Sequence, residues 1–165
     1  MSDEVEIGRG KRGRRAYTLD DIALVPSRRT RDPEDVNVGW QIDAYHVDTP
    51  LMAAPMDSVM SPETAIAFGR LGGIGVLDLD GLWTRYEDPT PILDHIAHLG
   101  EEESIATLQR VYSEPIKPSL ITARLKQLRE AGVVVAGKLS PQRVQKHWRA
   151  VVDAGVDLLI IRGST

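Results

Sequence analysis

The sequence predicts an α/β protein in which parallel strands alternate with covering helices. Short apolar runs recur at residues 51–54, 74–77, 133–136 and 157–161. The first pair of runs and the second pair are each separated by a segment with helix start and stop signals. Apart from Asp157, the runs are apolar throughout instead of alternating, which is typical of strands buried on both faces of a parallel sheet.

The amino-acid composition excludes several classes of protein and of functional site. The 165 residues carry a net charge of −4 and are 42% hydrophobic, which suits a packed core and gives no general attraction to nucleic acid. Because there is no cysteine, disulfides, thiolate metal sites and a thiol nucleophile are excluded from these residues. No apolar run approaches the ~20 residues of a membrane span, and the start of the chain lacks a signal peptide's apolar region. We therefore expect a cytoplasmic protein with neither nucleic acid nor membrane as partner.

Residues 1–16 are expected to form a basic, flexible and irregular arm, because they offer little to bury. Residues 8–13 read GRGKRG and match the pattern G-x-G-x-x-G. A dinucleotide site would require a strand before this pattern and a helix after it, and the sequence predicts neither. An arm that grips phosphate or nucleic acid is the alternative.

Three helices have clear boundaries. The first begins with Ser61 as N-cap and Pro62 at its first position, and it stops at Gly72. A second helix is expected over residues 119–131, and a third begins at Ser140. The predicted inner faces are Ala65, Ile66, Phe68 and Leu71 in the first helix, Leu120, Ile121, Leu125 and Leu128 in the second, and Val144, Trp148, Val151 and Val152 in the third.

The interval between residues 78 and 118 contains two further expected helices, over 92–99 and 102–112. His95 and His98 lie one helical turn apart there. Such a pair can bind a metal, but no third ligand is recognisable nearby, so solvated histidines are the simpler interpretation.

Four strand units are consistent with a doubly wound sheet or with part of a barrel. A (β/α)8 (TIM) barrel takes ~250 residues, so four units in 165 residues correspond to its N-terminal half. The sequence stops directly after the last strand, with no covering helix. We therefore expect residues 17–165 to be a partial barrel truncated after its fourth strand.

Two segments resemble the IMP dehydrogenase/GMP reductase family. Residues 17–26 read YTLDDIALVP, similar to the family's opening T-F-D-D-V-L-L-V-P. Residues 50–59 read PLMAAPMDSV and resemble its first barrel strand with the P-M-D-T-V loop. Residues 72–76, GGIGV, resemble its entry to the second strand. The likeness weakens over residues 79–118 and resumes at 154–157.

The resemblance implies a substrate-binding segment of Met56, Asp57 and Ser58, with the thioether of Met56 on the bound purine nucleotide. Asp57 is expected to orient the loop by accepting hydrogen bonds from backbone N–H groups, and Ser58 suits either purpose. The resemblance also implies a cofactor contact at Arg162, Gly163 and Ser164, where family dehydrogenases carry aspartate, serine and serine. An arginine there suits a phosphate.

The implied activity is oxidation of IMP to XMP with NAD, in purine (GMP) biosynthesis. In the family a cysteine thiolate attacks the purine, and that cysteine would lie beyond Thr165. The resemblance further implies a monovalent cation, whose site these residues lack, and a homo-oligomeric, tetrameric parent. The interval after residue 78 is too short for the family's pair of CBS modules, which indicates the short, CBS-less subfamily. GMP reductase with NADPH, and a purine-nucleotide-binding paralogue without turnover, are the alternatives; Ala54, where many members have serine, favours the latter.

Overall fold

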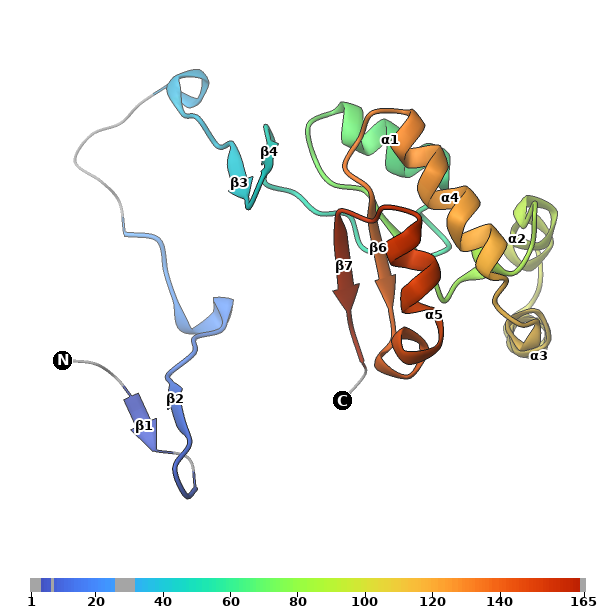
Figure 1. Ribbon diagram of the computed structural model, residues 1–165, viewed down its shortest axis with the longest axis horizontal. Coiled ribbons are helices and arrows are strands. Elements are labelled where there is room, and N and C mark those ends of the chain that lie inside the picture. The colour runs from blue at the N-terminus through green and yellow to red at the C-terminus, as the bar shows by residue number, and fades with distance from the viewer. Residues whose placement is uncertain (1–3, 7, 26–31, 164–165) are drawn as a thin grey trace. The chain divides into compact units, whose positions relative to one another are not determined.

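The computed structural model describes residues 4–6, 8–25 and 32–163. Contacts within the chain divide it into two compact units, Met1–Asn37 and Val38–Thr165. Each unit is described by itself below (Figure 1).

The first unit contains regular structure where the sequence predicted an irregular arm. Strands β1 (Glu4–Glu6) and β2 (Arg12–Arg14) pair antiparallel, with Val5 opposite Gly13. The glycine-rich residues supply the turn between them, because Gly8 and Gly10 have positive φ values of 65° and 73°. The G-x-G-x-x-G pattern is therefore a hairpin connection and does not open a helix.

Two short 3-10 turns complete the first unit, η1 (Leu19–Asp21) and η2 (Pro33–Asp35). The carboxylate of Asp21 accepts hydrogen bonds from both the N–H and the hydroxyl of Thr18, each 2.9 Å long. The opening motif of residues 17–26 thus contains a locally closed turn, as its Thr-x-x-Asp spacing allows.

The second unit is an α/β sheet with helices packed on it. After the antiparallel hairpin of β3 (Trp40–Ile42) and β4 (Tyr45–Val47), three parallel strands follow in the order β5 (Val76–Asp78), β6 (Ala136–Leu139) and β7 (Leu158–Ile161). Met52 forms an isolated parallel bridge to Ile74, so the first predicted strand adds to the β5 side of this sheet. The predicted parallel order of the four segments is confirmed.

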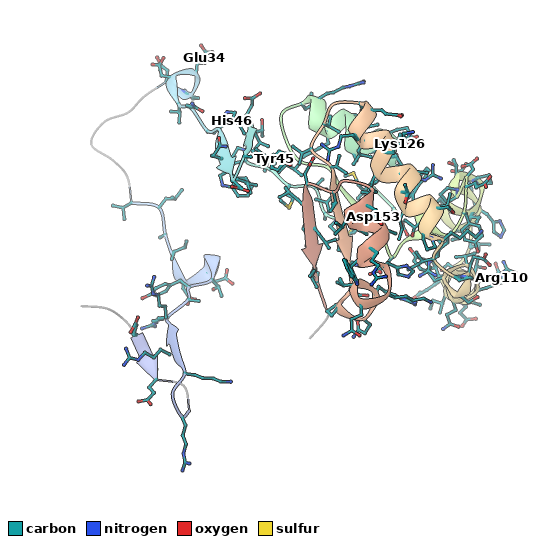
Figure 2. The ribbon with its side chains drawn as sticks, viewed as in Figure 1. Glu34, Tyr45, His46, Arg110, Lys126 and Asp153 are labelled. Atoms are coloured by element: carbon teal, nitrogen blue, oxygen red, sulfur yellow. The ribbon has the colours of Figure 1, made fainter. Side chains whose placement is uncertain are left out.

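The helices match their predicted positions closely. They are α1 (Pro62–Arg70), α2 (Thr90–Ala97), α3 (Glu101–Ser113), α4 (Pro118–Glu130) and α5 (Pro141–Asp153), with the short η3 (Leu82–Thr84) after β5. Helix α4 packs against both α1 and α5 (Figure 1). Lys126 on α4 and Asp153 on α5 lie on the outer, exposed surface of this helix layer (Figure 2).

The two faces of the sheet pack against different partners. Leu77, Leu139 and Val135 belong to the main core with the buried residues of α4 and α5, including Leu125, Leu128 and Val151. The intervening residues Ile74, Val76 and Ala136 form a second cluster with Val47 of β4. The alternation along the strands therefore directs one set of side chains to the helices and the other set to the opposite face.

Two predicted strands begin later than expected, and the run predicted as a buried strand at 51–54 forms only the isolated bridge at Met52, with Leu51 and Met52 exposed. The run at 133–136 was expected to be a strand, but β6 begins only at Ala136 and continues through Gly137 and Lys138. Val133 instead packs on α1, where a Cβ on Gly69 would lie 2.8 Å from its Cβ. Packing against neighbouring segments sets the strand position here and overrides the β propensity of the valines. The run predicted at 74–77 likewise becomes a strand two residues later, at Val76.

The predicted inner faces need two corrections. On α5, Val151 is buried as predicted, but Trp148 and Val152 are 45% and 56% exposed, while His147 is buried. Leu71, which follows the last residue of α1, is 78% exposed. The predicted face of α4 is confirmed, since Leu120, Ile121, Leu125 and Leu128 are all buried.

Candidate functional site

The loops that follow the parallel strands meet at one edge of the sheet. The N–H of Leu82 donates to Asp57 Oδ2 (2.7 Å), and the N–H of Ser140 donates to Asp80 Oδ2 (2.7 Å). The N–H of Arg162 donates to the last carbonyl of β6 at 3.1 Å. The two segments predicted to bind substrate and cofactor therefore lie at the same carboxyl edge, where α/β proteins carry their sites.

Met56 stands exposed at this edge, with half of its surface accessible. Its carbonyl oxygen accepts hydrogen bonds from the N–H groups of Val59 (3.0 Å) and Met60 (2.8 Å), which close a tight turn. The side chain of Met60 is buried in the main core. Met60 thus anchors the turn to the core. The turn presents the thioether of Met56 and the exposed Ser58 to solvent.

Asp57 points in the other direction, into the protein. Its Oδ2 accepts hydrogen bonds from the N–H of Leu82 and from the hydroxyl of Tyr112 at 2.5 Å. Its Oδ1 is buried and has no hydrogen-bond partner among the described residues. A Cβ on Gly81 would lie 2.2 Å from Oδ1, so the carboxylate fits only against a glycine. This geometry agrees with an orienting role for Asp57.

A charged cluster lies beside this turn, at the ends of β5 and β6. Lys138 Nζ lies 3.3 Å from Asp78 Oδ1 and 3.2 Å from Asp80 Oδ2, and each of the three side chains is less than one-fifth exposed. Burial alone would lower the pKa of Lys138, but the attraction of Asp78 and Asp80 outweighs it and raises the pKa. The ammonium therefore stays charged and links the two loops, while burial raises the pKa of Asp78.

The predicted cofactor segment is only partly described. Arg162 and Gly163 are exposed after β7, and Ser164 lies outside the described residues. A Cβ on Gly163 would lie 3.4 Å from Cγ of Pro141, at the start of α5. The exposed guanidinium of Arg162 is chemically suited to a phosphate group.

The interval between β5 and α4 offers no cluster suited to a metal. His95 and His98 are both exposed, and Nδ1 of His98 lies 2.7 Å from the carbonyl oxygen of Asp94. In the part of the chain that the structure describes, no group of three or more histidine, cysteine, aspartate or glutamate residues could hold a metal ion. Among the same residues, no helix has the length and apolar character needed to cross a membrane.

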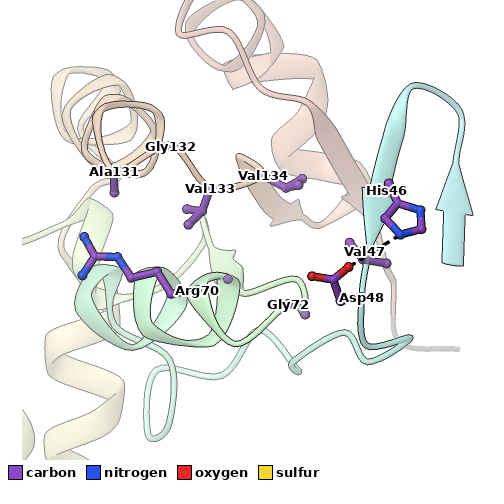
Figure 3. Close-up of a pocket in the computed structure, with 11 residues that line it drawn as sticks. His46, Val47, Asp48, Arg70, Gly72, Ala131, Gly132, Val133 and Val134 are labelled. Carbon is purple, nitrogen blue, oxygen red and sulfur yellow. Dashed lines mark ion pairs between the residues drawn. The ribbon is translucent and has the colours of Figure 1, made fainter. Parts of the chain in front are cut away.

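A pocket of about 240 Å³ opens at the opposite, amino edge of the sheet (Figure 3). Its wall includes Gly72, Gly132 and Val133, and His46 and Asp48 pair with each other across 3.6 Å. The pocket is remote from the carboxyl edge because most of its lining residues, such as Gly73 and Val134, come just before a parallel strand instead of after it. We therefore place the candidate site at the Met56 turn and not here.

Sequence reasoning missed several residues of this edge. Asp78 and Lys138 could have been found, since each is a polar residue at the end of an apolar run. Tyr112 carried no such signal, because it reaches Asp57 from a helix that lies 55 residues away in sequence. Only the tertiary structure brings these groups together.

The IMP dehydrogenase / GMP reductase domain model matches residues 16–165. The chain belongs to this family. An uncharacterized oxidoreductase of Mycolicibacterium smegmatis is 43% identical over 97% of this chain. An inosine-5'-monophosphate dehydrogenase of Methanocaldococcus jannaschii is 41% identical over 64 residues. The crystal structure of an IMP dehydrogenase/GMP reductase-like protein from Corynebacterium glutamicum superposes with a TM-score of 0.81 and 42% identity over 98% of this chain.

The family match makes the chain a member of an oxidoreductase family, as the resemblance implied. The chain spans less than half of its full-length relatives, 44% of the mycobacterial protein and 44% of the corynebacterial one. The archaeal dehydrogenase is matched over only 39% of this chain and 13% of its own length.

Proposed function

We propose that this chain supplies the first half of a (β/α)8 barrel in an NAD-dependent enzyme that oxidises IMP to XMP. The observation that carries the proposal is the Met56 turn at the carboxyl edge of the parallel strands, in a chain matched by the family over residues 16–165. In this proposal the second half of the barrel, beyond residue 165, supplies the cysteine nucleophile that splits the reaction into two easier steps.

The residues of this edge fit a dinucleotide and a purine nucleotide by their chemistry. The exposed thioether of Met56 offers a polarizable apolar surface to a purine. Arg162 and Gly163 would hold a phosphate of NAD. The bound NAD would supply the acceptor for the hydride. Lys138 has no spare charge for that task, because Asp78 and Asp80 neutralise it. The chain's own contribution is to bind and orient the nucleotide.

The test uses the chain continued by its second barrel half, incubated with IMP and NAD while NADH absorbance is followed. We expect turnover, and we expect Met56→Ala to raise the KM for IMP about tenfold through lost apolar contact. Met52→Ala is the matched control, because Met52 is also partly exposed but precedes the turn. If the protein binds IMP but forms no NADH, the dehydrogenase proposal is wrong and the protein is a nucleotide binder without turnover.

That second candidate has specific support. Arg162 stands where family dehydrogenases carry an aspartate, and Ala54 stands where many members have a serine. Calorimetry with IMP and GMP separates binding from turnover. A parallel assay with GMP and NADPH tests the reductase reaction, which would proceed with loss of NADPH absorbance.

A further inference from the structure

We propose that Tyr112 is a positioning residue for the nucleotide-binding turn: its hydroxyl fixes Asp57, and through Asp57 the neighbouring Met56. This inference rests on the proposed function, since it assumes that Met56 meets the nucleotide. It assigns a role in that site to helix α3, which is not one of the loops that directly follow a strand.

The carboxylate of Asp57 depends on very few contacts. Its two hydrogen bonds, from Leu82 and Tyr112, both end on Oδ2, while Oδ1 is buried without a partner among the described residues. Oδ1 lies so near Gly81 that a Cβ at position 81 would be only 2.2 Å from it. Loss of the Tyr112 hydroxyl would leave the partly buried carboxylate with a single donor, and hydrogen bonds to charged groups are the strong ones.

Tyr112 is itself held in a defined position. The guanidinium of Arg85 lies 5.6 Å from the centre of its ring. Arg85 is only 5% exposed and donates to the carbonyl oxygens of Asp80 (2.9 and 3.2 Å) and Glu114. These contacts of Arg85 join the end of α3 to the loop after β5. They hold Tyr112 in position, with its hydroxyl beside Asp57.

The hydroxyl acts as a donor throughout the neutral pH range. Burial, followed by the hydrogen bond to Asp57, raises the pKa of Tyr112 far above its ordinary value. The phenol therefore remains protonated wherever the enzyme works. The contribution of Tyr112 to nucleotide binding should accordingly be independent of pH across that range.

The experiment compares two tyrosines of the same region in the chain continued by its second barrel half. Tyr112→Phe removes the hydroxyl that meets Asp57. Tyr86→Phe removes a hydroxyl that donates to the carbonyl oxygen of Val111 (3.1 Å) and does not contact Asp57. We expect Tyr112→Phe to raise the KM for IMP about tenfold with kcat within about twofold, and Tyr86→Phe to leave the KM unchanged.

A second measurement does not depend on activity. Amide hydrogen exchange should be faster in Tyr112→Phe at Val59 and Met60, whose N–H groups close the turn, and unchanged in Tyr86→Phe. The inference is overturned if Tyr112→Phe keeps the exchange rates of the unmodified protein, or if Tyr86→Phe changes them equally. Should the unmodified protein fail to oxidise IMP, the proposed function fails, while the exchange rates still decide the role of Tyr112.

Discussion

At the scale of single residues, two aspartate carboxylates join segments at opposite edges of the sheet. Asp57 does so at the carboxyl edge, as described above. Asp157, just before β7, accepts hydrogen bonds from Arg129 Nη2 (2.6 Å), the Tyr45 hydroxyl (2.7 Å) and the N–H of Val135 (2.8 Å). Its side chain is only 7% exposed. Each carboxylate accepts a hydrogen bond from a backbone N–H group, as a carbonyl oxygen does within a sheet.

Asp157→Asn should destabilise the fold by about 2–3 kcal/mol, because a neutral amide weakens three hydrogen bonds to a buried charge. Burial raises the pKa of Asp157, but the hydrogen bonds from Arg129, Tyr45 and Val135 outweigh it, so the pKa is lowered. The stabilisation is therefore present above the ordinary carboxyl pKa of about 3.9 and is lost as the pH falls through the lower folded value. Urea unfolding as a function of pH measures both effects.

The matched control is Asp153→Asn, which changes an exposed aspartate on the neighbouring helix (Figure 2). It should alter the free energy of unfolding by less than about 0.5 kcal/mol. Equal stability of the two variants would contradict the role given to Asp157.

Gly81→Ala should disturb the Asp57 carboxylate directly, since its Cβ would lie 2.2 Å from Oδ1. We expect a loss of about 1–3 kcal/mol in stability, typical of overpacking, together with weaker IMP binding. Gly100→Ala is the control, because a Cβ there meets nothing within 4 Å. Thermal unfolding and IMP titration measure the two effects; a Gly81→Ala protein that matches Gly100→Ala in both would refute the close packing described here.

At the scale of elements, the helices begin where their sequence signals lie, but their N-terminal ends are stabilised differently. Ser61 accepts a hydrogen bond from the N–H of Thr64 (3.1 Å) at the start of α1. Ser140 occupies the same position before α5 and makes no such bond with its side chain. Instead, its N–H donates to Asp80 at the site edge.

Ser61→Ala should therefore cost about 1 kcal/mol of stability, the usual effect of losing a capping side chain. Ser140→Ala should cost clearly less, because only its backbone is used. Chemical denaturation of the two variants side by side gives the difference. A larger loss in Ser140→Ala would show that the two caps have been assigned the wrong way round.

At the scale of the whole molecule, the sheet presents apolar surface that the described residues leave uncovered. Ile161 of β7 is 57% exposed, and Trp148 and Val152 of α5 are exposed as well. In the proposed barrel the next strand and helix would cover this surface. The exposed edge accordingly supports the larger assembly proposed above.

We expect the 165-residue chain by itself to self-associate and to give no NADH from IMP and NAD. Association follows from the apolar edge, and the lack of turnover follows from the absence of any cysteine in the sequence. Sedimentation at several concentrations, with Val152→Lys as the comparison, tests the first expectation. A monomer at all concentrations, or turnover at an enzymatic rate, would contradict the respective half of this prediction.

The sequence by itself determined the α/β class, the positions of the helices and the parallel order of the strands. These features depend on local signals, such as the Ser61 cap and the apolar runs, which act within a few residues of chain. The resemblance of residues 50–59 to the first strand and loop of the family also indicated where the Met56 turn lies.

Only the tertiary structure decided the strand boundary at Ala136, the inward position of His147 in place of Trp148, and the partners of Asp57. Each depends on which segment lies opposite, and segments distant in sequence leave no local trace of their meeting. Tyr112 illustrates the reason: its helical position is readable from the sequence, but its hydrogen bond to Asp57 exists only because α3 folds back over the loop after β5.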